Sequence, residues 1–276
     1  MPHADPRTWL AWCTLATLLV LLCMEARMLR ARSAAFDGRE AARNLAMGIV
    51  AQGAAVVAGG LLVGPLFAWV HRHRLFELAP GPVAAIAAFV LLDLCFYAMH
   101  RTTHRVRWFW CAHVTHHSCE RMNLSVAIRV NVFGAFNGHW LFYAIPVAAG
   151  FDPGWVGLAV ALDLAYQQFL HTTLVPRLHP LVEWIFNTPA HHRVHHAANA
   201  RYVDANFGGI LIVWDRLFGT FRAEHADEPV VYGLAQPLRE AGWWGAWTHE
   251  YRGLLRELRG ARAWRQRLAL PWRAPG

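Results

Sequence analysis

The stretch PVAAIAAFVLLDLCFYAMHRTTHRVRWFWCAHVTHH at residues 82–117 joins one long apolar segment directly to two histidine motifs. A helix needs roughly 20 apolar residues to cross a bilayer, and Pro82 to Met99 approaches that length. Four more stretches are similarly long and apolar: Trp9 to Met24, Leu45 to Val70, Val130 to Gly150 and Trp155 to Leu170. We therefore predict an all-α polytopic membrane protein with four to five transmembrane helices and a cytoplasmic helical cap that carries the histidines.

The composition supports a lipid environment. Of 276 residues, 56% are hydrophobic and only 16% are charged, which is too apolar for an ordinary soluble domain. The five cysteines form no CxxC pair and predict no disulfide framework. We predict one integral membrane domain over residues 1–276, with N-terminal transmembrane helices at 9–99, a histidine-motif catalytic region with two further membrane helices at 100–221, and a basic, Trp-rich interfacial tail at 222–276.

The arginines predict the orientation. The net charge is +8, but the arginines lie beside apolar runs and form no separate basic face, so we expect no nucleic-acid partner. Arg27, Arg30 and Arg39 follow the first apolar run, whereas the turn at 151–154 has no arginine. Short cytoplasmic loops keep positive charge. We expect a multi-pass protein of a bacterial-type inner membrane, with its histidine motifs on the cytoplasmic side.

The histidine spacing carries the functional hypothesis. HRTTH at 100–104 places two imidazoles on one helix face, and HVTHH at 113–117 and HRVHH at 192–196 repeat one spacing. The nine candidate catalytic and metal-binding residues are too many for one tetrahedral zinc: His100, His104, His113, His116, His117, His171, His192, His195 and His196. Two ions with four or five nitrogens each would keep positions open for a small oxidant, which favours two irons, although zinc is possible in purified protein.

Polar residues beside these motifs are candidates for orienting them. Asp93 and Tyr97 share a helical face with His100, and Asp163 and Gln167 precede His171 at steps of four. We predict that Asp93 and Asp163 accept hydrogen bonds from ligand histidines, with remote helix-to-helix bonding as the alternative for Asp163. We expect three residues near the last motif to support it: His191, Asp204 and Asn206. In the fourth apolar run, we expect His139 either to face a substrate cavity or to form hydrogen bonds between helices.

The order HxxxH, HxxHH, lone His and HxxHH resembles the fatty acid hydroxylase and sterol desaturase superfamily. NTPAHHRVHH at 187–196 and GGILIVWDRLFGTF at 208–221 resemble the branch that includes alkylglycerol monooxygenase. The resemblance implies two iron ions, O2, a fatty acyl, sterol or ether lipid substrate, and hydroxylation. RVNVFGAFNGHW at 129–140 departs from the His and Pro found there in many relatives, which bears on substrate fit.

No flavin or haem motif is evident, so we expect a separate electron donor such as a ferredoxin, cytochrome or reductase. Three alternatives remain open. A desaturase would use the same centre and remove a second hydrogen. A metal transporter would need ligands along a path at the membrane midplane. A membrane zinc hydrolase would need a Glu inside its histidine motif, as in HExxH, and none of the three motifs has one.

Overall fold

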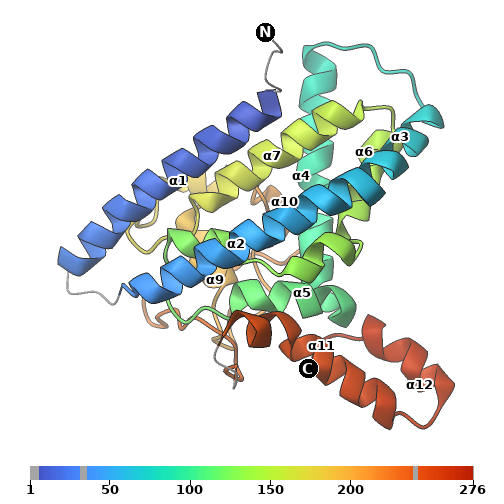
Figure 1. Cartoon of the computed structure of the whole chain (residues 1–276). Coiled ribbons are helices and arrows are strands. Elements are labelled where there is room, and N and C mark those ends of the chain that lie inside the picture. The colour runs from blue at the N-terminus through green and yellow to red at the C-terminus, as the bar shows by residue number, and fades with distance from the viewer. Residues whose placement is uncertain (1–5, 32–35, 239–241, 276) are drawn as a thin grey trace.

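A computed structural model describes residues 6–31, 36–238 and 242–275 (Figure 1). The described residues form no strand, and two isolated bridges, Phe186 with Leu211 and Ala197 with Tyr232, are their only β-type pairings. The prediction of an all-α chain is confirmed. The helices of the N-terminal half are α1 (Pro6–Ala31), α2 (Gly38–Ala58), α3 (Gly64–Arg72), α4 (Pro82–Arg105) and α5 (Arg107–His117).

Most helices after α5 are short. They are α6 (Ala144–Ala148), α7 (Pro153–Gln168), α8 (Pro180–Ile185), α9 (Pro189–His195), α10 (Val213–Leu217), α11 (Trp243–Gly260) and α12 (Trp264–Ala269). A π-helical turn, Gly59–Val63, joins α2 to α3, and four 3-10 turns lie at Leu124–Ile128, Val132–Phe136, His139–Tyr143 and Leu270–Trp272. In Figure 1, α1 packs on α7 and the two run nearly parallel, while α4 crosses α7.

Two helices within the described ranges are long and apolar enough to span a membrane. One is the continuous helix Gly38–Arg72, of 35 residues, and the other is α4, of 24 residues. Only 17% and 33% of their most apolar windows are buried by the rest of the chain. Ile49 and Val83 are 72% and 80% exposed. Such open apolar faces are suited to lipid and not to water.

The expected continuous span over Val130–Gly150 is wrong. The chain there makes two 3-10 turns and then α6. Asn131 accepts a hydrogen bond from the backbone amide of Phe133, and Asn137 does the same for His139, so side chains replace the helical pattern. Gly138 then adopts a left-handed φ of 88°. The predicted fifth span corresponds to α7, which has only 16 residues, and the first falls within α1.

The predicted interfacial tail packs on α5. Leu254 and Leu258 of α11 lie against Cys111, so this leucine face is turned into the protein. Arg107 of α5 donates to Glu250 at 2.8 Å and to Glu257 at 2.6 Å. Trp243, Trp244 and Trp264 stay exposed, as an interfacial segment requires. Residues 239–241 and 276 of the predicted tail lie outside the described residues.

Truncation of the docked leucine tests this packing. Leu254 is 3% exposed and Leu255 is 44% exposed. Leu254→Ala removes buried apolar contacts and should lower the free energy of unfolding by about 2–5 kcal/mol, whereas Leu255→Ala should change it by less than about 0.5 kcal/mol. Thermal unfolding in detergent, with limited proteolysis of α11, measures both. Equal effects of the two substitutions would mean that α11 does not dock on α5.

Candidate metal centre

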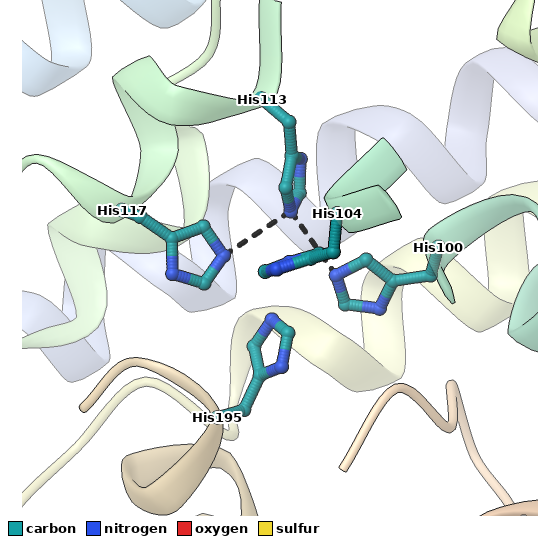
Figure 2. Close-up of side chains that lie close together, drawn as sticks. All are labelled: His100, His104, His113, His117 and His195. Carbon is teal, nitrogen blue, oxygen red and sulfur yellow. Dashed lines mark hydrogen bonds between the residues drawn. The ribbon is translucent and has the colours of Figure 1, made fainter. Parts of the chain in front are cut away.

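The nine predicted histidines meet in two adjoining groups. Within each group the nitrogen atoms offered by the members lie within 4.8 Å of one another. Figure 2 shows the larger group, whose rings turn toward a common centre: His100, His104, His113, His117 and His195. The smaller group consists of His116, His171, His192 and His196. Each set could hold one metal ion.

Helical periodicity explains how each HxxHH motif serves both groups. Residues four apart lie one above the other, whereas a neighbour in sequence points about 100° away. In α5, His113 and His117 therefore face the larger group and His116 faces the smaller one. At α9 the allocation is reversed, because His192 and His196 face the smaller group and His195 the larger. The stacked rings of His117 and His196, with centroids 4.4 Å apart, join the groups.

The spacing between nitrogens fits coordination of one ion per group. Two imidazole nitrogens bound at about 2.1 Å and at right angles lie about 3.0 Å apart. In the larger group, His113 Nε2 lies 3.1 Å from His100 Nε2 and 3.2 Å from His117 Nε2. In the smaller group, His192 Nε2 lies 2.9 Å from His171 Nε2 and 3.1 Å from His196 Nε2. His113 and His192 thus have two close ligand neighbours each.

Backbone carbonyls set which nitrogen carries the proton. His100 Nδ1 bonds to the carbonyl of Phe207 at 3.0 Å, and His171 Nδ1 to that of Gln167 at 2.9 Å. His195 Nδ1 bonds to the carbonyl of Ala205 at 2.9 Å. A carbonyl only accepts, so each Nδ1 must carry hydrogen and each Nε2 must keep its lone pair. These lone pairs point into the groups, as metal ligation requires.

Buried nitrogens without partners support the same fit. His104 Nε2 and His195 Nε2, both of the larger group, have no hydrogen-bond partner among the described residues. A buried polar atom left unpaired costs about 1–3 kcal/mol, which a metal ion would offset. No carboxylate belongs to either group within the described chain. Two all-imidazole sets suit a transition metal better than magnesium or calcium, which prefer oxygen.

Burial keeps the imidazoles neutral. It lowers the pKa of His195 to about 4 and, with the charge of His195 as a smaller cause, the pKa of His116 to about 3. Burial and then the neighbouring rings hold the pKa values of His113, His117 and His192 well below the usual range. Neutral rings at physiological pH are ready to bind a cation without releasing protons.

The acids predicted to orient the histidines have other partners. Asp93 accepts from the backbone amide of Ile210 at 2.9 Å and from Trp214 Nε1 at 2.7 Å. Asp163 accepts from Gln167 Nε2 at 2.7 Å, and it is the carbonyl of Gln167 that bonds to His171. Asp93 therefore fixes the segment after α9 and acts on the histidines only through the backbone, which corrects the expected direct contact.

Asp204 and Asn206 lie close to the groups. Both adopt a left-handed φ, of 60° and 58°, which is uncommon for residues other than glycine. Asp204 lies 3.6 Å from His104 Nδ1 and pairs with Arg105. Asn206 donates to the carbonyl of His191 at 3.0 Å. The strained backbone at 204–206 brings the carbonyl of Ala205 to His195.

The other three candidates lie outside both groups. Tyr97 bonds to Thr220 at 3.0 Å and stacks on Phe218. The His191 ring faces Glu183 at 3.3 Å. His139 Nδ1 contacts Asn137 at 2.6 Å, and the ring is only partly buried.

Asp215 is a supporting residue that the sequence interpretation missed. Its carboxylate accepts from the backbone amides of Phe207 at 2.8 Å and Gly208 at 2.7 Å, and from Thr220 at 2.6 Å. It thereby holds the residue whose carbonyl orients His100. The signal was an acid within the apolar run at 208–221, because a fully buried carboxylate needs several donors.

Residues 85–220 match the sequence profile described as fatty acid hydroxylase, and that range contains all nine histidines. This region belongs to the fatty acid hydroxylase family. This membership agrees with the resemblance carried by the histidine motifs.

Alignments with curated relatives cover between 55% and 68% of this chain. Human alkylglycerol monooxygenase is 42% identical over 178 residues, or 64% of this chain and 39% of that protein. The zebrafish (Danio rerio) alkylglycerol monooxygenase is 39% identical over 68% of this chain and 41% of its own length. An ornithine lipid hydroxylase from Rhizobium tropici is 28% identical over 55% of this chain and 45% of its own length. The aligned region is thus less than half of each relative, and no solved structure matches.

Substituting a histidine that has two close ligand neighbours should prevent metal binding by its group. His192→Ala takes away the nitrogen nearest to both His171 and His196. We expect bound metal to fall from about two ions per chain to about one, because a lost ligand should weaken binding at that group by more than the roughly 10–100-fold that a lost outer-shell partner costs. Metal analysis by mass spectrometry measures this. The exposed His225, which belongs to neither group, provides the control, because His225→Ala should keep the full metal content. Unchanged metal in His192→Ala would exclude the smaller group as a site.

Stability of the metal-free protein should fall in acid. Unfolded histidine has a pKa near 6.5, whereas folding lowers the pKa of His116 to about 3 and of His195 to about 4. The unfolded chain therefore binds more protons below pH ~6.5, so this stabilisation is complete above that pH. It is lost as the pH falls toward about 4 for His195 and about 3 for His116. Thermal unfolding after chelation, at stepped pH, measures it. His225→Ala should give the same profile, and a flat profile across this window would contradict neutral buried rings.

Proposed function

We propose that this chain is a multi-pass membrane oxygenase that uses two irons and O2 to hydroxylate a lipid. The observation that carries the proposal is the pair of adjoining, buried, all-histidine groups within the family region. When bound there, iron would supply the reductive activation of O2. The histidines would hold the two ions, His100, His104, His113, His117 and His195 around one, and His116, His171, His192 and His196 around the other.

The surrounding rings limit access of water. Trp110 packs 5.2 Å from the His104 ring and 5.7 Å from His117, between ring centroids. Phe207 lies 5.1 Å from His104 and 5.9 Å from His195. Aromatic walls of this kind keep the reacting carbon and the oxidant away from bulk water, which would otherwise divert a reactive centre. They support chemistry on an apolar substrate.

A lipid substrate is supported by the open apolar helices and by the relatives. Gly38–Arg72 and α4 carry exposed apolar faces long enough to span a membrane. The relatives' names specify an alkylglycerol and an ornithine lipid, and both describe oxygen insertion. We take hydroxylation as the outcome for this chain, with the histidine groups at the cytoplasmic side of a bacterial-type inner membrane. The electrons would come from a separate donor, such as a ferredoxin, cytochrome or reductase.

Two competing classes lack a supporting feature in the described residues. A zinc hydrolase would need a carboxylate beside the ligands to act as general base. Asp204 lies 3.6 Å from His104, but it is already paired with Arg105. A transporter would need ligands spread along a path, whereas these nine lie together. Desaturation would use the same residues and differs only in product.

Oxygen-18 labelling tests the proposal. Cells with wild-type protein, His116→Ala or the control His225→Ala are grown under labelled O2, and their acyl, sterol and ether lipids are profiled by mass spectrometry. We expect a lipid product with one labelled oxygen in wild type and control, reduced about 100-fold in His116→Ala, which removes a ligand of the smaller group. A product lighter by two hydrogens would indicate a desaturase. Identical profiles for all three proteins would exclude the activity.

A further inference from the structure

A cavity of about 870 Å³ lies between α4 and α7, within the size range of ligand sites. Its walls are mostly apolar and include Ala85, Ala88 and Leu92 of α4 and Leu158, Ala159 and Leu162 of α7. The alanines leave the space that larger side chains would fill. None of the nine histidines lines it, so it is distinct from the metal centre.

One aromatic ring separates the inner end of the cavity from the larger histidine group. Phe96 lines the cavity, and its ring lies 5.3 Å from the His100 ring, between centroids. Gly209 packs under Phe96, where a Cβ atom would come within 2.9 Å of the phenylalanine ring and 2.4 Å of Asp163 Oδ1. Asp93 holds the adjoining backbone at Ile210. Packed residues therefore close the inner end of the cavity, and the Phe96 ring lies between it and His100, a candidate metal ligand.

The outer rim is polar, and the arginine in its lining is already paired with a carboxylate. Arg74 pairs with Glu77 and also donates to the carbonyl of His71. Asp152 is occupied as the cap of α7, accepting from the amides of Gly154 and Trp155. A rim whose guanidinium is already paired with a carboxylate, beside a second carboxylate, favours a neutral, hydroxylated head group over an anionic one. The polar rim and apolar walls together match an amphiphile with its head outward.

The length of the cavity fits a long alkyl chain. Along α4, the lining runs from Ala84 to Phe96. Twelve helical residues rise about 18 Å. An extended chain advances about 1.2 Å per bond, so about 15 bonds span that distance. A chain of roughly this length would reach from the rim to Phe96.

We propose that this cavity holds the alkyl chain of a neutral lipid substrate, with its head at the Arg74 and Asp152 rim and its far end at Phe96. Phe96 then determines how deeply the alkyl chain reaches, and so which carbon comes nearest to the ring that separates the cavity from His100. The proposal rests on the proposed function and names its substrate class, which is neutral lipids with one long alkyl chain that can enter this cavity.

Photolabelling tests occupancy without turnover. The purified full chain in phosphatidylcholine nanodiscs is exposed to an alkylglycerol of about 16 carbons that carries a diazirine near its chain end. We expect the label at Leu92 and Phe96, with competition by unlabelled alkylglycerol and not by phosphatidic acid. Competition by phosphatidic acid, or label confined to the rim, would overturn the assigned occupant or its direction.

Two alanines of α4 provide a matched pair of variants. Ala88 lines the cavity, whereas its neighbour Ala87 does not line it and is exposed. Ala88→Phe fills the space and should reduce labelling at least about tenfold, and Ala87→Phe should leave it unchanged. Phe96→Ala should extend the preferred chain by about two to four carbons, since a ring's depth becomes available. Equal labelling of both alanine variants would overturn the proposal.

Failure of the cavity assignment can be told from failure of the oxygenase assignment. If wild-type protein forms the oxygen-18 product and Ala88→Phe forms as much, the alkyl chain of the lipid binds elsewhere and the oxygenase assignment stands. If labelling follows the cavity variants but no lipid acquires oxygen, the cavity holds a lipid and the oxygenase assignment is wrong.

Discussion

Nine imidazoles can share one buried volume only while they are uncharged, and the rest of the fold depends on this constraint. Burial, followed by the neighbouring rings, makes the protonated rings unstable. Neutrality leaves one N–H on each ring, and that hydrogen needs an acceptor. For His100, His171 and His195 the acceptor is a backbone carbonyl. The lone pair on the opposite nitrogen is then fixed, and its direction is set by the path of the main chain.

The irregular segment after α9 follows from this requirement. Carbonyls inside a regular helix or sheet are already paired, so those that face His100 and His195 must come from chain that is neither. Residues 204–208 supply them with two left-handed residues and no regular structure. Such a segment needs side chains to take up its amides, and Asp215 does so for Phe207 and Gly208. The Asn206 side chain in turn accepts from the amide of Arg222 and so ties the segment to the chain that follows. The apolar run with a buried acid at 208–221 is thus part of the metal centre without contributing a ligand.

The sequence predicted the histidine groups better than their support, for a physical reason. Ligands repeat at helical spacing, so α4, α5 and α9 could be predicted to present them on defined faces. Asp93 lies on the same helix face as His100, but the spacing does not predict which neighbouring element packs against that face. In the structure, the backbone amides of residues 210 and 211 donate to Asp93 there. Apolar composition likewise predicted a span at 130–150, where Asn131, Asn137 and Gly138 interrupt the helix. The leucine face of α11 fits a membrane surface as well as a protein surface. The packing of Leu254 on Cys111 and the ion pairs with Arg107 decide between them.

The reversed allocation of the two HxxHH motifs makes the two groups mechanically interdependent. Because α5 and α9 each contribute to both groups, a displacement of either helix disturbs both. A shift of one residue in either motif would turn histidines from one group toward the other, so the two helices cannot change register independently.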